Sequence, residues 1–226
     1  MSLEQPLRLT GRSSSHFTRV ARMFAHELSV PIELDVVHDL TGLDASSYGG
    51  HPGLKIPTLH AGGSVLFGTD NICRRLAEIA GRANDPRVVL GHHVTSDLAR
   101  SAQELVWHAM GLQVQLVVGV QLAKLPVENL FFAKATAGLE GELAWLEEHL
   151  EPELAGLPAP RDVSVFEVTL LCLLEHLRFR PTISLDPWPR LRGFVATYAL
   201  RESARRTVYR FDAPRAATAR TSDGDA

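Results

Sequence analysis

The chain has very little cysteine and no excess of positive charge. Of its 226 residues, only Cys73 and Cys172 are cysteines. A disulfide-dense scaffold, a Cys-x-x-Cys redox pair and a four-cysteine zinc site are therefore excluded. The formal net charge is −3 and the pI is about 6.4, which disfavours a generally basic nucleic-acid-binding protein. We expect a protein of the reducing cytoplasm with no nucleic-acid partner.

The sequence also lacks a convincing export or membrane-spanning segment. Its first 25 residues have no unbroken apolar run followed by a small-residue cleavage site. The most apolar stretch, residues 105–125, is long enough to cross a bilayer. However, it contains several polar residues, which are costly to place in hydrocarbon. These polar residues are His108, Gln113, Gln115, Gln121 and Lys124. We expect a buried helix there and no membrane contact.

The first 80 residues alternate strand-like and helical patterns. Strands are predicted at 7–10, 32–37, 56–59 and 65–67, and helices at 16–28 and 69–79. The serines of Ser13–Ser15 stand where side chains cap the first turn of a helix. The glycines of Ala61–Gly63 predict a hairpin turn. The predicted order is β-α-β followed by ββα, which is an α/β unit.

From about residue 92 the pattern becomes helical. A helix is predicted at His92–Val118, and leucines recur at helical spacing at 139, 143, 146 and 150. Ser164 and Glu167 form an S-x-x-E capping box ahead of an apolar helix, Val165–Leu177. We expect an α/β domain at 1–82, a linker at 83–91 and an all-helical domain at 92–212. The polar residues 213–226 predict a disordered tail.

Four motifs accompany this organisation. The turn Leu9-Thr-Gly-Arg-Ser-Ser-Ser15-His-Phe17, with Arg22 beyond it, precedes a helix. His51-Pro-Gly-Leu-Lys-Ile-Pro57-Thr-Leu59, Leu66-Phe-Gly-Thr-Asp-Asn-Ile72 and the Ser164 box near Leu157-Pro158 follow. In this order and spacing they resemble the cytosolic glutathione S-transferase superfamily, serine-type and of unassigned class, over about residues 6–210.

The resemblance implies a fold, an activity and an oligomeric state. The fold is a thioredoxin-like glutathione-binding domain with a four-stranded mixed sheet, followed by an all-α domain. The activity is a transferase that activates the glutathione thiol for attack on a small apolar electrophile. Glutathione is then a co-substrate, and the chain is expected to form a two-fold homodimer in which the first domain of one copy packs on the helical domain of the other.

Ser15 is the candidate catalytic residue, with Ser13 and Ser14 as alternatives. The reactive form of a thiol is the thiolate, and a free thiol with a pKa of about 8.5 is largely protonated at neutral pH. A hydroxyl aimed at the sulfur at a helix N-terminus favours the anion. Simple helix capping by the three serines is the alternative. Because the turn has no cysteine, disulfide exchange is disfavoured and the reactive sulfur must come with the ligand.

By resemblance, the glutathione-binding residues are Lys55, Ile56, Pro57, Gly68 and Thr69. The Ile56–Pro57 bond is expected to be cis and to turn the Ile56 backbone toward the cysteinyl part of the ligand. An edge-strand proline without a ligand is the alternative. Thr69 stands at a helix start, where it can cap the helix or bind a carboxylate. Lys55 adds charge there or is a solvated surface lysine.

The acceptor site is expected between the Ser15 turn and the predicted helix His92–Val118. Trp107 and Met110 are the candidate lining residues, with core packing as the alternative. The sequence departs from the family at two positions, where Gly68 replaces a glutamate and His16 replaces a frequent proline.

Two other functions stay open at this stage. One is a glutathione-dependent isomerase, as in zeta-like members with a Ser-Ser-Cys turn. The other is a non-catalytic ligand-binding or interaction protein, which the Gly68 departure favours. No metal site is expected, because the adjacent His92 and His93 do not chelate together easily and no paired Cys/His spacing is present. Cys73 and Cys172 are expected to be buried apolar residues.

Overall fold

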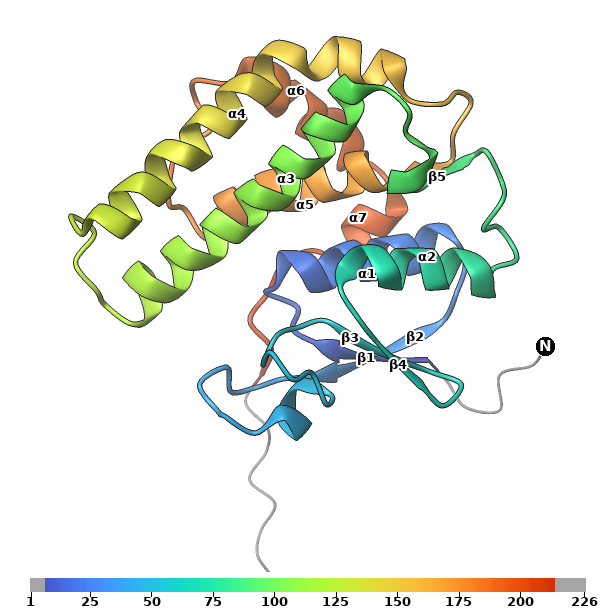
Figure 1. The fold of residues 1–226 in the computed structure, drawn as a ribbon, viewed down its shortest axis with the longest axis horizontal. Coiled ribbons are helices and arrows are strands. Elements are labelled where there is room, and N and C mark those ends of the chain that lie inside the picture. Colours follow the sequence, from blue (N-terminus) through green and yellow to red (C-terminus); the bar gives the residue numbers. More distant parts are fainter. Residues whose placement is uncertain (1–6, 214–226) are drawn as a thin grey trace, which may run out of the picture.

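The structure, a computed structural model, describes residues 7–213. The predicted tail at 213–226 therefore lies, apart from Ala213, outside the described residues. An α/β domain comes first and a helical domain follows it (Figure 1). The predicted fold class, a thioredoxin-like domain followed by an all-α domain, is confirmed. The domain boundaries at 82 and 92 stay predictions.

The first domain is built on a four-stranded mixed sheet with the order β2-β1-β3-β4. Strand β1 pairs in parallel with β2, whereas β3 pairs antiparallel with both β1 and β4. Helices α1 and α2 lie together on one face of the sheet (Figure 1). The elements are β1 (Leu7–Gly11), α1 (His16–Glu27), β2 (Ile32–Val36), the short η1 (Ala45–Tyr48), β3 (Thr58–Ala61), β4 (Ser64–Phe67) and α2 (Thr69–Ile79).

The helical domain is arranged around α5, whose twelve buried residues leave little of it in contact with solvent. The leucines of α4 at 139, 143, 146 and 150 are all buried, as their spacing predicts. The elements are β5 (Val88–Val89), η2 (Gly91–His93), α3 (Asp97–Leu116), the π-helical turn η3 (Val117–Leu122), α4 (Leu130–Gly156), β6 (Val163–Ser164), α5 (Val165–Phe179), α6 (Pro189–Tyr198) and α7 (Glu202–Arg206).

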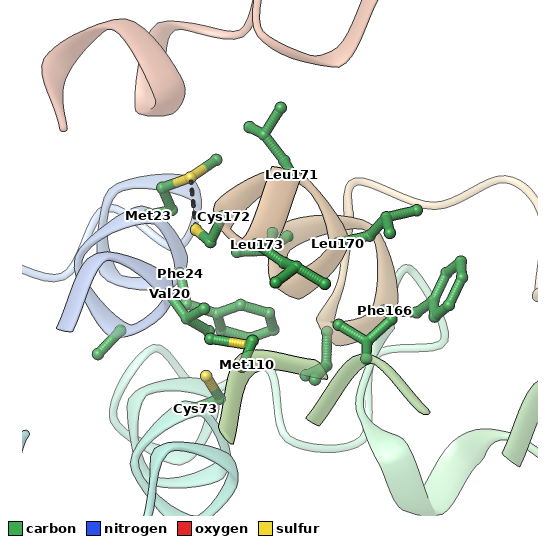
Figure 2. Close-up of a cluster of buried hydrophobic side chains, with 14 of the residues drawn as sticks. Val20, Met23, Phe24, Cys73, Met110, Phe166, Leu170, Leu171, Cys172 and Leu173 are labelled. Atoms are coloured by element: carbon green, nitrogen blue, oxygen red, sulfur yellow. Dashed lines mark hydrogen bonds between the residues drawn. The ribbon is translucent and has the colours of Figure 1, made fainter. Parts of the chain in front are cut away.

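One hydrophobic core joins the two domains. Figure 2 shows Met23 and Phe24 of α1 beside Cys172 of α5, with Cys73 of α2 and Met110 of α3 close by. The Cys172 thiol lies 3.7 Å from the Met23 sulfur. All of these side chains are completely buried, so α1 and α5 are held together by apolar packing across the domain boundary.

One predicted helix start and one predicted capping box need correction. Helix α3 begins at Asp97 and not at His92, because the Ser96 hydroxyl accepts a hydrogen bond from the Ala99 amide and caps the helix there. At α5 the Ser164 hydroxyl accepts from the Glu167 amide at 3.1 Å. The Glu167 carboxylate, however, binds Arg161 in a bidentate pair, so only one half of the predicted capping box is seen.

The predicted apolar helix forms part of this helical domain. The segment Asp97–Leu122 is long and apolar enough to cross a membrane, judged by length and composition alone. A third of its most apolar window is buried, and α3 packs against both α4 and α5.

Candidate functional site

The strand register brings three predicted site segments to one end of the sheet. Thr10 of β1 lies opposite Thr58 of β3, and Thr58 lies opposite Phe67 of β4. One step further along, the Gly11–Ser15 turn, Pro57 and Gly68 therefore lie side by side. Helices α1 and α2 both begin at this end. Because helix N-termini carry partial positive charge and free amides, this end of the sheet is suited to an anionic ligand.

Ser15 is the N-cap of α1. Its hydroxyl oxygen accepts a hydrogen bond from the Thr18 amide at 3.2 Å, and the side chain is partly exposed. A hydroxyl that accepts through its oxygen keeps its own proton for donation. Ser15 can therefore cap the helix and still donate to a bound sulfur. The turn is tight: a Cβ on Gly11 would lie 2.5 Å from the Thr18 hydroxyl.

The two alternative serines differ from Ser15 in exposure. Ser13 is 1% exposed and its hydroxyl has no partner among the described residues. Its amide donates to a carboxylate oxygen of Asp212 at 2.8 Å. Ser14 is partly exposed and its carbonyl oxygen lies 3.2 Å from Nε2 of His176. The turn is thus held by residues 162 and 199 positions away. Of the three serines, Ser15 alone combines a cap position with a partly exposed side chain.

The Ile56–Pro57 peptide bond is cis, as the resemblance implies. Pro57 is buried, Ile56 is partly exposed and Lys55 is exposed. The ring of His51 lies 4.6 Å from the ring of Phe67, between centroids. Partial burial, and then the charge of Lys55, lowers the pKa of His51. This margin of the site therefore favours a neutral imidazole beside a cationic lysine.

Helix α2 begins without a side-chain cap. Gly68 is its N-cap residue, with φ of +85°, and no side-chain oxygen caps the first turn. Thr69, the first helical residue, is buried. The uncapped amides leave room for an acceptor from a ligand, since a helix otherwise needs partners for its first N–H groups. Gly68 and Thr69 thus stand at an uncapped helix N-terminus, which is suited to a carboxylate.

Two guanidinium groups add positive charge near the turn. Burial, and then the charge of Arg12, lowers the pKa of Arg180. The buried Nε of Arg12 has no hydrogen-bond partner among residues 7–213. The Arg180 guanidinium is stacked over the ring of Phe211, 4.6 Å from its centroid. Two mutually repelling cations are stabilised by an intervening anion, which agrees with the two helix N-termini nearby.

The two candidate acceptor-site residues lie in different places. Trp107 is partly exposed, and its ring stacks parallel to that of Phe17 at 6.0 Å between centroids. Met110 is completely buried in the core and offers no surface to a ligand. Helical spacing puts Val114 of α3 and Val118 of the following η3, both exposed, on the same side as Trp107. Sequence reasoning missed these two valines.

The other predicted residues are also located. Both cysteines are buried, as predicted. Burial raises the pKa of Cys172 to about 12 and that of Cys73 well above its usual value, so neither is a thiolate nucleophile. His92 and His93 lie in η2. Among residues 7–213, no group of three or more His, Cys, Asp or Glu side chains is arranged to hold a metal.

Three residues that contact the turn were not identified from the sequence as functional. His16 was noted only as a departure from proline. His176 follows an apolar run and Asp212 precedes a polar tail, so neither carries a local signal. Only the fold brings them to Ser13 and Ser14.

The comparisons with known proteins agree with this geometry. A glutathione S-transferase N-terminal domain model matches residues 14–79. A search of curated protein sequences found no significant match. A glutathione S-transferase structure from Methylobacillus flagellatus with glutathione bound is 19% identical, with a TM-score of 0.69, and the alignment covers 90% of this chain and 100% of that one.

Two further bacterial structures are equally similar. A glutathione transferase family member from Pseudomonas fluorescens with bound glutathione is 19% identical, with a TM-score of 0.70 and coverage of 90% of this chain and 99% of that chain. A glutathione S-transferase from Methylobacterium radiotolerans in complex with glutathione sulfonate is 18% identical, with a TM-score of 0.70 and coverage of 93% and 98%.

Identities this low establish the fold alone, and the family model matches less than half of the chain. The resemblance stated from the sequence is confirmed at this level, and the class stays unassigned. Residues 14–79 match the glutathione S-transferase N-terminal domain model, and the chain as a whole has the same two-domain fold as these glutathione S-transferase structures.

Proposed function

We propose that this protein is a glutathione transferase-like enzyme that binds glutathione where α1 and α2 begin and activates its thiol. The observation that carries the proposal is the meeting of two helix N-termini with the cis Ile56–Pro57 bond at one end of the sheet. Glutathione is an anion with a thiol and carries carboxylates at both ends. Its chemistry fits a site made of free amides, a hydroxyl and cationic side chains.

In this proposal each site residue has one role. The Ser15 hydroxyl donates a hydrogen bond to the sulfur and favours the thiolate, because hydrogen bonding to the charged form lowers its pKa. The Ile56 backbone pairs with the cysteinyl part of the ligand. Gly68 and Thr69 present the α2 amides to the γ-glutamyl carboxylate, with charge from Lys55.

The acceptor is proposed to be a small apolar electrophile. Trp107 and Val114 of α3, with Val118 of η3, supply an apolar face on the side of the first domain. The thiolate sulfur attacks an electrophilic carbon there, and with a chlorinated aromatic acceptor a carbon–sulfur bond forms while chloride leaves. Generic apolar lining does not specify one substrate.

The test is calorimetric titration with glutathione combined with a conjugation assay on a chlorinated aromatic acceptor. We expect binding at or below millimolar glutathione and turnover that depends on it. Absence of binding at millimolar concentration would overturn the proposal. Binding without conjugation of any acceptor would move the assignment to one of the two alternatives below.

The first alternative is glutathione-dependent isomerisation, which the run of serines at the turn favours. The bond rearrangement then leaves glutathione unconsumed. Turnover of maleylacetoacetate at constant glutathione would identify this activity, whereas net loss of glutathione identifies conjugation.

The second alternative is a non-catalytic ligand-binding or interaction protein, favoured by Gly68 at the position of the family's glutamate. Ser15 already has a structural role as the cap of α1, which a non-catalytic protein also needs. In that case a Ser15→Asn variant, which keeps a capping side chain, retains all ligand binding.

We further propose a homodimer in the cytoplasm. A groove of about 440 Å³ runs along β4 and α2, with Val65 exposed in it and Arg74 and Arg75 among its lining residues. We assign this groove to the helical domain of a second copy. Light scattering should give twice the chain mass, and Val65→Asp should yield monomers; a wild-type monomer at micromolar concentration contradicts the assignment.

A further inference from the structure

The helical domain reaches into the candidate site through one buried histidine. His176 of α5 is 5% exposed, and its Nε2 lies 3.2 Å from the carbonyl oxygen of Ser14 in the turn before α1. A carbonyl oxygen only accepts, so Nε2 must carry the proton. In the neutral imidazole with this tautomer, Nδ1 is an acceptor.

The acceptor nitrogen of His176 has a matching donor on α3. Nε2 of Gln113 lies 3.3 Å from His176 Nδ1 and donates a second hydrogen bond to the Arg180 carbonyl at 2.8 Å. The Thr182 hydroxyl donates to Oε1 of the same glutamine. Every donor in this network of hydrogen bonds meets an acceptor. The direction of each bond and the tautomer of His176 are therefore fixed together.

The bond to Ser14 fixes a peptide group next to the candidate catalytic residue. The Ser14 carbonyl belongs to the same planar peptide unit as the Ser15 amide. That amide donates to the Arg12 carbonyl at 3.2 Å. Both ends of the unit are therefore held, and the plane sets the direction in which the Ser15 side chain leaves the backbone.

A second contact from the helical part of the chain holds Ser13, the residue before Ser14. The Ser13 amide donates to Asp212, which follows α7. The ring of His16, the first residue of α1, lies 4.4 Å from the ring of His176 between centroids. His176 thus packs on one side of the turn while it hydrogen-bonds to the turn's backbone.

We propose that His176 is a positioning residue for the thiol site. Through the Ser14 carbonyl it orients the Ser15 hydroxyl and the first amides of α1, and Gln113 keeps it in the required tautomer. It contacts the backbone of the turn and not the sulfur. The part of this inference that concerns the thiol rests on the proposed function; the part that concerns the turn does not.

Two polar variants and one apolar variant test the role. In His176→Gln, the amide N–H can reach Ser14 as Nε2–H does. His176→Asn is also polar, but its side chain is one carbon shorter and does not reach the carbonyl. His176→Phe keeps the ring without a donor. If the phenylalanine variant does not fold, the Gln and Asn pair still decides the question.

The matched control is Thr169→Val. It removes a buried hydrogen bond between the same two helices, from Gln103 of α3 to Thr169 of α5 at 3.1 Å, which does not involve the turn. Thr169 lies seven residues before His176, about two helical turns away. Any general loosening of the α3–α5 contact therefore appears in the control as well.

The first measurement is amide hydrogen exchange of the ligand-free full chain at residues 13–18. We expect exchange to rise about tenfold or more in the Asn and Phe variants, because the opening of the turn becomes easier, and to stay near wild type in the Gln variant and in Thr169→Val. The second measurement is the pKa of the enzyme-bound glutathione thiol, followed by thiolate absorbance. We expect it to rise in the Asn and Phe variants alone, with kcat reduced more than KM is changed.

The outcomes separate the two proposals. If wild type binds no glutathione, the proposed function fails and hydrogen exchange alone decides the positioning role. If the Asn and Phe variants match Thr169→Val in exchange at the turn, the positioning role is overturned whatever the activity. If exchange responds but the bound thiol pKa does not, His176 orders the turn without acting on the thiol, and the proposal as stated is wrong.

Discussion

At the scale of single residues, Ser15 combines two tasks that one substitution series can separate. Its oxygen caps α1 through the Thr18 amide, and its proton is free for a ligand. Asparagine caps helices as well as serine does, whereas alanine does not, at a cost of about 1 kcal/mol. We expect Ser15→Ala to lose both stability and thiol activation, and Ser15→Asn to keep stability but lose activation.

The measurements for this series are the free energy of unfolding in urea and the pKa of enzyme-bound glutathione. Ser15→Thr, which has both a capping oxygen and a hydroxyl, is the control and should lie nearest to wild type. If Ser15→Asn retains the wild-type thiol pKa, the hydroxyl does not act on the sulfur and Ser15 is a cap alone.

A second prediction at this scale concerns the titration of His176. Burial, with only partial compensation by the Ser14 carbonyl, lowers its pKa from 6.5 to about 4, and the charges of Arg180 and Arg19 act in the same direction. Between these values the unfolded chain binds a proton that the folded chain does not. The folded state is therefore destabilised as pH falls from about 6.5 to 4, by up to about 3 kcal/mol.

The test is the difference in unfolding free energy between wild type and His176→Gln across this range. The difference isolates the histidine from Glu142 and Glu153, whose burial raises their pKa to about 7 and gives the opposite dependence on pH. We expect the variant to lose less stability than wild type as pH falls. Parallel curves for the two proteins would contradict the assignment.

At the scale of elements, the start of α2 depends on a backbone conformation that favours glycine. Gly68 has φ of +85°, where a side chain is strained by about 1–3 kcal/mol. We expect Gly68→Ala to lower the free energy of unfolding by that amount, although a Cβ there would meet no atom closer than 3.4 Å. The family's glutamate at this position would carry the same strain in this chain.

The control is Gly141→Ala in the exposed interior of α4, where a Cβ meets nothing within 4 Å. Alanine should stabilise that helix by about 0.5–1 kcal/mol. Urea unfolding of both variants checks the prediction, and a change of the same sign at the two positions would show that the conformation of Gly68 is not a constraint.

The same elements show what the sequence could and could not predict. Local patterns located β1, α1, the β3–β4 hairpin and α2, because periodicity, serine caps and turn glycines all act within a few residues. The sequence pattern placed the start of α3 five residues too early, at His92. The helix begins after the Ser96 cap, and the apolar spacing alone did not show which residue starts it. Met110 was named as a candidate lining residue, with core packing as the alternative, because helical spacing alone does not show that its side chain is completely buried.

The contacts that complete the candidate site were beyond local reasoning. The bond from His176 to Ser14 spans 162 positions and that from Ser13 to Asp212 spans 199. Each depends on how α5 and the segment after α7 pack on α1. No local motif specifies such packing, whereas the Ser15 turn was identified from local pattern and the cis Ile56–Pro57 bond was expected from the resemblance.

At the scale of the whole molecule, Arg19 joins three parts of the chain. This residue of α1 is 2% exposed and forms an ion pair with Glu175 of α5. It also donates to the Thr207 hydroxyl and the Ala204 carbonyl, each at 3.3 Å, and lies over the Tyr209 ring at 4.4 Å. The Arg19 guanidinium thus links α1 of the first domain to α5 and to residues 204–209. The segment that follows these residues contains Asp212, which binds the turn.

Removing such a group leaves buried partners uncompensated, which costs about 3–5 kcal/mol. We expect Arg19→Met to lose that much unfolding free energy and to increase hydrogen exchange at residues 207–212 as well as at the Ser13 amide, because Asp212 is no longer held in place. The control is Arg206→Met, which breaks the exposed pair with Glu202 on α7 and should cost less than about 1 kcal/mol. Equal losses in the two variants would mean that Arg19 is not needed to join the domains and does not order the turn at the candidate site.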